Sequence, residues 1–91
     1  MKLIFRIHAI QRMFERKVDA GDIRAILESG ETIENFPDDL PYPSWLILGW
    51  RGKRPLHVVV ADNPGEDEVI IVTVYEPEVR QWESDFKRRK R

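Results

Sequence analysis

The sequence predicts an α+β fold, in which two N-terminal helices pack on one face of a twisted antiparallel sheet of about four strands, followed by a short C-terminal helix. Two observations give this prediction. Apolar residues recur with a helical period over residues 1–30, and with the alternation of β-strands from there to Tyr75. Helices that precede a run of strands are typical of α+β domains, because parallel sheets need alternating strands and helices.

The first predicted helix carries cations on one side. His8, Arg12 and Arg16 are spaced four residues apart and fall on one helix face. Ile10 and Phe14 lie on the opposite side, and we expect this side to be buried. An imidazole beside two guanidinium groups suits a phosphate or carboxylate ligand. A solvated helix face with ordinary surface ion pairs is the alternative.

The second predicted helix has a well-defined start. Asp19 is the expected N-cap, and Asp22 lies at the third helical position, where a carboxylate can face the exposed amides. Val18 and Ile23 occupy the two positions of a hydrophobic staple. We therefore expect a tight turn before Asp19, and we expect the helix to end at Gly30.

Strands and turns are predicted after the two helices. A loop with three prolines at residues 37–43 follows the first strand, and turns at residues 51–55 and 62–67 separate the others. The four expected strands are Thr32–Phe36, Ser44–Trp50, Leu56–Ala61 and Glu68–Tyr75. Pro77 can begin a short C-terminal helix, because apolar residues after it recur at i, i+3 and i+7.

The length of 91 residues allows a single domain, which we place at residues 1–86, and the net charge of −1 conceals a basic tail at residues 87–91. All five tail residues are basic, so residues 1–86 carry 10 basic and 16 acidic side chains. A basic terminus is usually a disordered tail that binds polyanions, with a merely solvated end as the alternative. The acidic body argues against nucleic-acid binding over the whole surface. The absence of cysteine excludes disulfides and thiolate chemistry. We expect no metal site, no membrane segment and a cytoplasmic location.

A second cluster of polar side chains is expected on the strands. If Leu56–Ala61 and Glu68–Tyr75 pair as antiparallel neighbours, His57 approaches Tyr75 on one face of the sheet, near the basic turn that contains Lys53 and Arg54. An imidazole, a phenol and cations together suit acid–base chemistry on a phosphodiester. The alternative is a buried histidine with satisfied hydrogen bonds and a tyrosine that only packs.

Four motifs in order resemble a known family. They are HAxxRMxxR ending at Arg16, the capped second helix, RPLHVVVA at Arg54–Ala61 and TVYEP at Thr73–Pro77. Over residues 4–86 the chain is similar to domain-of-unknown-function family 4258, a group of small bacterial and archaeal proteins. That family is grouped with the RelE/ParE toxin superfamily.

The resemblance implies a RelE-like fold and a toxin of a type II toxin–antitoxin pair. Many relatives are metal-independent ribonucleases that cut mRNA without a cofactor, and the implied partner is an antitoxin with an MqsA-type zinc finger. The recurring positions of the family are His8, Arg12, Arg16, His57 and Tyr75 in this sequence. The acidic body departs from RelE-type ribonucleases, which are basic. ParE-type members are not nucleases, so fold alone does not determine activity.

Our hypothesis is cleavage of single-stranded RNA by attack of a ribose 2′-hydroxyl on the adjacent phosphodiester. The reaction needs a base, an acid and fixed positive charge, with either histidine as base or acid. The expected catalytic residues are His8, Arg12, His57 and Tyr75, and the expected RNA-binding residues are Arg16, Lys53 and Arg54. The alternative is a non-catalytic binding module that pairs with a small antitoxin-like partner or forms a homodimer.

Overall fold

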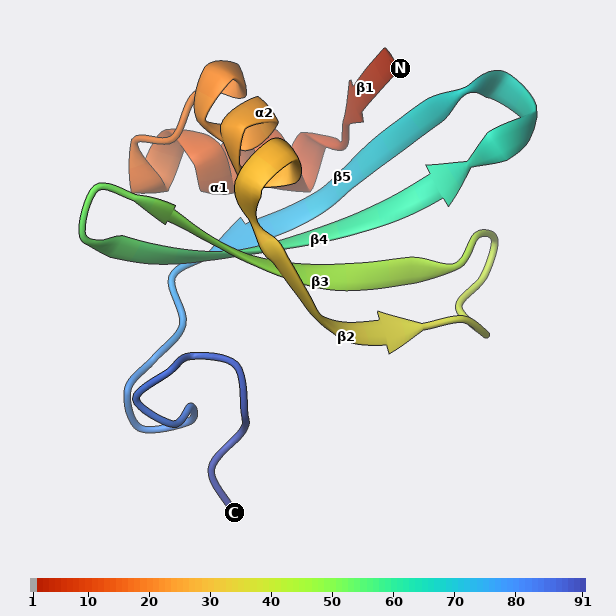
Figure 1. The fold of residues 1–91 in the computed structure, drawn as a ribbon. Helices are drawn as coiled ribbons and strands as arrows, with labels where there is room; N and C mark the ends of the chain where they lie inside the picture. Colours follow the sequence, from red (N-terminus) through yellow and green to blue (C-terminus); the bar gives the residue numbers. More distant parts are fainter. Residues whose placement is uncertain (1) are drawn as a thin grey trace.

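A twisted five-stranded sheet organises the fold of this computed structural model, which describes residues 2–91 (Figure 1). The elements are β1 (Lys2–Phe5), α1 (Ile7–Arg16), α2 (Ala20–Ser29), β2 (Glu31–Phe36), β3 (Ser44–Arg51), β4 (Arg54–Asn63), a 3₁₀ turn at Pro64–Glu66, and β5 (Glu68–Tyr75). The strand order across the sheet is β1-β5-β4-β3-β2. Strand β1 runs parallel to β5, and the other neighbours are antiparallel.

The α+β class and the order of helices before the main strands are confirmed. The expected number of strands is one too low, and the expected antiparallel sheet is in fact mixed, because β1 is parallel to β5. The prediction missed β1, since residues 1–30 were expected to be helical. The apolar side chains of Leu3, Ile4 and Phe5 instead lie along β5, so that Ile4 is opposite Ile70. A run of four residues is too short for its period to distinguish a strand from a helix.

The start of α2 confirms the predicted cap. The Asp22 N–H donates to Asp19 Oδ1 at 2.8 Å, and the Asp19 N–H donates to Asp22 Oδ2 at 3.0 Å, which completes a capping box. Gly30 ends the helix with an extended backbone. A Cβ atom at Gly30 would lie 2.5 Å from the Ile26 carbonyl oxygen, so close approach of the backbone requires glycine here.

The prediction for the buried face of α1 is wrong. Ala9 and Met13 are the buried residues of the helix, whereas Ile10 is 53% and Phe14 is 87% exposed. The small side chain of Ala9 fits α1 against the sheet, where the helix packs on β5. The contact face therefore lies between the cationic side and the apolar side. As a result, Ile7, Ile10 and Phe14 form an exposed apolar stripe.

The C-terminal helix expected after Pro77 is also absent, and that prediction is wrong. Residues 81–90 form an irregular hairpin, which we call the C-terminal hairpin. The Glu83 N–H donates to the Arg88 carbonyl at 2.8 Å, and the Lys90 N–H donates to the Gln81 carbonyl at 2.9 Å. These backbone groups thus pair across a turn instead of along a helix.

A local side-chain contact explains why the turn forms. The Asp85 carboxylate accepts from the Lys87 N–H at 2.9 Å and from Arg88 Nε at 3.1 Å. Phe86, between them, has a left-handed backbone with φ 59°. An aspartate that binds its own backbone two residues on favours a turn over a helix.

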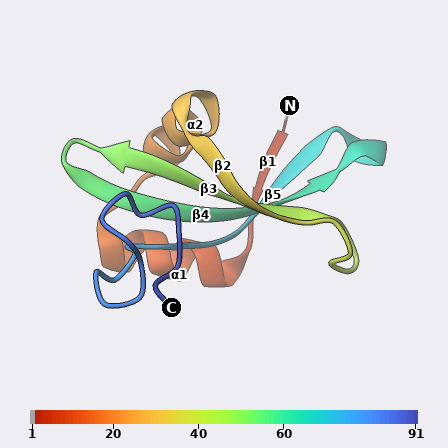
Figure 2. The same ribbon diagram turned by 60° about the horizontal axis from the view of Figure 1, so that its bottom comes forward.

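The two faces of the sheet are covered by different parts of the chain. Both helices lie on one side, and the C-terminal hairpin lies on the other (Figure 1). The side view brings the hairpin forward over β4 (Figure 2). The core between the sheet and the helices contains Ala9, Met13, Val18, Ile23, Ile26, Ile47, Leu56, Val58, Val60, Ile71 and Val74. No helix within residues 2–91 is long and apolar enough to cross a membrane.

Candidate active site

The strand register places four side chains in one row across the sheet. Glu31 of β2 is opposite Leu48 of β3, Leu48 is opposite His57 of β4, and His57 is opposite Tyr75 of β5. Residues directly opposite one another point to the same face. Because Leu56 and its alternate neighbours are in the core under the helices, His57 and its row face the other side, towards the C-terminal hairpin. The predicted approach of His57 to Tyr75 is confirmed.

Both ring nitrogens of His57 have hydrogen-bond partners. Nε2 lies 2.8 Å from the Phe86 carbonyl oxygen, and Nδ1 lies 3.2 Å from the Tyr75 hydroxyl. A carbonyl oxygen only accepts, which assigns the ring proton to Nε2. Nδ1 is then the acceptor, and the Tyr75 O–H donates to it. The network therefore joins a neutral imidazole to a protonated phenol.

The C-terminal hairpin covers this pair. The Trp82 ring meets the His57 ring edge to face, with centroids 4.4 Å apart and planes at 88°. Trp82 is 2% exposed and His57 is fully buried. A second aromatic contact joins Phe86 to Trp50 at the end of β3, with centroids 6.0 Å apart. His57 is consequently closed to solvent in this structure, whereas Tyr75 is half-buried.

Burial sets the protonation states of the two groups. Desolvation lowers the pKa of His57 below its ordinary 6.5, because a buried imidazolium loses its hydration. The Phe86 carbonyl partly opposes this change, and the positive charge of Arg89 adds to it. Desolvation also raises the pKa of Tyr75 above 10. At neutral pH His57 is thus a neutral base, and Tyr75 keeps its proton.

Ion pairs attach the hairpin to the edge strand β2. Arg89 Nε lies 3.0 Å from Glu34 Oε1, and Lys87 Nζ lies 3.1 Å from Glu31 Oε1. The Arg89 guanidinium also lies over the Trp82 ring, 4.6 Å from its centroid. The same arginine therefore connects the cover of His57 to the sheet edge.

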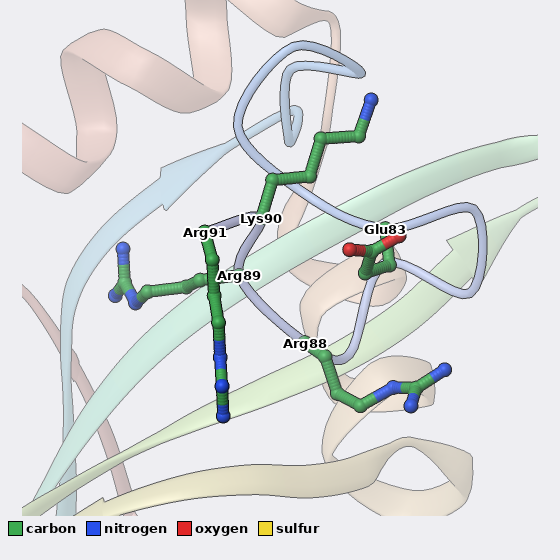
Figure 3. Close-up of a pocket in the computed structure, with 5 residues that line it drawn as sticks. All are labelled: Glu83, Arg88, Arg89, Lys90 and Arg91. Atoms are coloured by element: carbon green, nitrogen blue, oxygen red, sulfur yellow. The ribbon is translucent and has the colours of Figure 1, made fainter.

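A concavity of about 570 Å³ lies within the C-terminal segment (Figure 3). It is lined by Glu83, Arg88, Arg89, Lys90 and Arg91. The four cationic side chains point to different sides in Figure 3. Such an arrangement suits an extended polyanion with several charges better than one small anion.

The cations of α1 do not join this site. His8 is exposed, and Arg12 forms an ion pair with Glu15 at 3.0 Å. Helix α1 packs on the face of the sheet opposite the one that His57 occupies. The first helix and the His57–Tyr75 pair therefore form separate clusters, contrary to a single composite site.

The remaining predicted RNA-binding residues lie near the end of α1. Arg54 Nη2 donates to the Arg16 carbonyl at 2.8 Å and lies 3.5 Å from Glu76 Oε2. The Nε atom of Arg16 is buried and has no hydrogen-bond partner within residues 2–91. Lys53 is exposed in the turn between β3 and β4. Arg54 thus ties the helix to the sheet, and Lys53 is free to contact a ligand.

Sequence reasoning missed the residues that close the site. Trp82, Phe86 and Arg89 reach His57 or its cover from 25 to 32 positions away along the chain, and Glu34 of β2 lies 55 positions from Arg89. No periodicity signals contacts of this separation. Alternation alone would put Glu31 and Glu34 on opposite faces of β2, and the β-bulge between Thr32 and Glu34 brings both glutamates to the side of the basic terminus.

The arrangement can transfer protons. A neutral imidazole accepts a proton, a phenol donates one, and the hydrogen bond between them lets a proton pass from one to the other. Among residues 2–91, no three histidine, aspartate or glutamate side chains are grouped to hold a metal ion.

Comparison with known proteins gave one match. Residues 5–76 match the model of a family described as Domain of unknown function (DUF4258). Searches of curated proteins and of solved structures found no significant match. The matched range contains His57 and Tyr75 and ends before the C-terminal hairpin.

Proposed function

This chain belongs to the DUF4258 family, and we propose that it is a metal-independent endoribonuclease of the RelE/ParE type, the toxin of a type II toxin–antitoxin pair. The observation that carries the proposal is the hydrogen-bonded His57–Tyr75 pair, which Trp82 connects to Arg89 of the cation-lined concavity. Base, acid and positive charge are the three requirements for cleavage by a 2′-hydroxyl, and this face of the sheet has all three.

The lowered pKa of His57 and the raised pKa of Tyr75 suggest their roles. His57 Nδ1 accepts the proton of the ribose 2′-hydroxyl as the 2′-oxygen forms its bond to phosphorus. The bond from phosphorus to the 5′-oxygen breaks, and Tyr75 donates its proton to that leaving oxygen. The products are a 2′,3′-cyclic phosphate and a 5′-hydroxyl.

The hydrogen bond between the two residues completes the cycle. After cleavage, His57 carries an extra proton on Nδ1 and Tyr75 is a phenolate. The 3.2 Å separation of Nδ1 and the Tyr75 oxygen lets the proton return to the phenolate. Both residues are then ready for another turnover without an external proton carrier.

Positive charge for the phosphorane comes from the hairpin in this proposal. Arg89 is attached to the cover of His57, whereas Arg12 and Arg16 belong to the helix on the other face. Guanidinium groups match phosphate oxygens in a two-point geometry. Lys53, at the adjacent turn, can follow the RNA backbone.

Induced expression in bacteria tests the function, with growth and total RNA as readouts. We expect the wild-type chain to arrest growth and degrade RNA, and His57→Gln or Tyr75→Phe to relieve both effects. His8→Gln and Tyr42→Phe are the matched controls, because they change the other histidine and the other tyrosine. Relief by His8→Gln with none by His57→Gln would place the chemistry on α1. Unimpeded growth with intact RNA for every variant would refute a ribonuclease toxin.

One observation favours the second candidate, a binding module for a small antitoxin-like partner. Ile7, Ile10 and Phe14 form an exposed apolar stripe along α1, and such stripes typically dock against another protein. Co-purification with the product of the neighbouring gene tests it. We expect Phe14→Ser to abolish co-purification and Val79→Ser, at another exposed apolar position, to leave it unchanged.

A further inference from the structure

The C-terminal hairpin is attached to β2 by contacts that water and salt can reach. The Lys87–Glu31 and Arg89–Glu34 pairs have partly exposed side chains on both partners. Exposed ion pairs are individually weak and are screened by salt. The hairpin is therefore held at this edge by interactions that another anion can replace.

The distribution of charge decides which ligand replaces them. In both pairs the cation belongs to the hairpin and the carboxylate belongs to the sheet. An anion that binds Lys87 and Arg89 thus removes the attachment of the hairpin to β2. Arg89 contacts both oxygens of Glu34, at 3.0 and 3.5 Å, and a phosphate can replace this carboxylate because its oxygens accept the same two parallel hydrogen bonds.

Release of Arg89 also affects the cover of His57. The Arg89 guanidinium lies 4.6 Å from the centre of the Trp82 ring. The same ring contacts His57, with the two ring centres 4.4 Å apart. When Arg89 moves to a phosphate, Trp82 loses the cation that fixes it against the sheet edge. The Phe86 carbonyl that accepts from His57 Nε2 belongs to the same turn, three residues from Arg89.

The ligand is an extended one. Arg88, Arg89, Lys90 and Arg91 surround the concavity and point to different sides, as Figure 3 shows. A single-stranded polyphosphate chain presents charges at regular intervals and can contact several of them together. Once uncovered, Trp82 offers an aromatic face on which a base can stack.

We propose that the C-terminal hairpin is the binding element for single-stranded RNA, and that binding lifts it from β2 and uncovers His57 and Tyr75 while Arg89 stays on the bound phosphate. The identity of the polyanion as RNA rests on the proposed ribonuclease function. The proposed displacement of the hairpin does not depend on that function, because it is argued from the ion pairs and the aromatic cover. In this proposal RNA binds to the hairpin, and the same binding event exposes His57 and Tyr75.

The experiment measures displacement of the C-terminal hairpin by an RNA that cannot be cleaved. A labelled 2′-O-methyl oligouridylate of about 12 nucleotides cannot be cut, since it has no free 2′-hydroxyl to attack. Binding is followed by fluorescence anisotropy, and the cover by NMR. The buried His57 Nε2–H is assigned by its absence from His57→Gln, and the Trp82 indole N–H by its absence from Trp82→Phe.

We expect the oligouridylate to bind, to remove the His57 ring N–H signal by exchange with water, and to shift the Trp82 signal. Lys87→Ala with Arg89→Ala should weaken binding roughly ten-fold. The slope of log K against log salt concentration should fall by the amount that corresponds to the loss of about two phosphate contacts. Binding with an unchanged His57 signal would overturn the proposal, and so would an absence of binding.

A matched pair of variants tests the attachment. Glu31→Gln with Glu34→Gln removes both carboxylates, and we expect the His57 signal to be weakened without any RNA. Glu28→Gln with Glu66→Gln changes the net charge equally on exposed positions of α2 and the β4–β5 turn, and we expect no effect. Equal behaviour of the two double variants would contradict attachment through β2.

Two further probes separate the sources of phosphate. Oligothymidylate tests whether DNA displaces the hairpin, and inorganic polyphosphate tests whether bases are needed. Displacement by polyphosphate but not by oligouridylate would refute RNA as the ligand. Displacement by the oligouridylate, together with intact RNA in the expression experiment, would refute the ribonuclease function and retain the hairpin as an RNA-binding element.

Discussion

At the scale of single residues, His57 is the side chain on which the account depends. It lies fully buried, and its two nitrogens are satisfied by Tyr75 and the Phe86 carbonyl. A buried imidazole of this kind is compatible with a structural role as well as a catalytic one. Its chemistry, however, is fixed: burial favours the neutral ring.

The lowered pKa of His57 predicts loss of stability in acid. Below pH 6.5 the unfolded chain takes up a proton on this histidine while the folded chain does not, until the pH reaches the lower folded pKa. Within this window the free energy of unfolding should fall by about 1.4 kcal/mol per pH unit from this group. Urea unfolding between about pH 7.5 and pH 5 measures it, with the slope of His57→Gln subtracted. Equal slopes for both proteins would mean that His57 titrates normally.

Arg12 provides a contrasting prediction. Its guanidinium is paired with Glu15 on α1, on the opposite side of the sheet from His57. We expect Arg12→Ala to change the unfolding free energy by less than about 0.5 kcal/mol and to leave RNA cleavage within about three-fold of wild type. Cleavage assays on the purified variant check this. A loss of two orders of magnitude would return Arg12 to the mechanism.

At the scale of elements, the sequence predicts best those features that depend on residues close to one another in the chain. The capping box of Asp19 and Asp22 is readable because both partners lie within one helical turn. The approach of His57 to Tyr75 is only partly readable. The short turn brings the two strands together, but a register shift between Val59 and Val60, which the sequence does not signal, sets His57 opposite Tyr75. Strand β1 is not readable, since its four residues pair with a strand more than 60 positions away.

The orientation of α1 shows a different limit. The helix has two possible inner faces, one with the larger side chains Ile10 and Phe14, and one with Ala9 and Met13. Size favours the first, but fit against β5 selects the second. A small residue that permits close packing gives almost no hydrophobic signal, so only the tertiary structure reveals its role.

Substitutions on α1 test this orientation directly. We expect Phe14→Ser to change the free energy of unfolding by no more than about 0.5 kcal/mol, because its side chain is already in water. Met13→Ala, one position away, should cost about 2–4 kcal/mol, since it leaves a cavity under the helix. Urea denaturation of both variants decides between the two faces. The reverse ranking would mean that Phe14 is the core residue.

At the scale of the whole molecule, the uneven distribution of charge holds the C-terminal hairpin over His57. Five of the 15 basic residues are in the last five positions, and the remaining chain has an excess of acidic groups. Two of these cations, Lys87 and Arg89, fold back onto glutamates of β2 and thereby hold an aromatic cover over His57. The composition predicted the asymmetry, but not that the basic terminus lies against the acidic body.

The most direct test of the account is the rate at which the purified protein cleaves a labelled single-stranded RNA. We expect Glu31→Gln with Glu34→Gln to cleave several-fold faster than wild type, because the cover opens more readily. Adding His57→Gln to the same background should lower the rate by at least roughly 100-fold, the contribution typical of a general base. Undiminished cleavage after the loss of His57, or no cleavage by the opened variant, would contradict the assignment of this face as the active site.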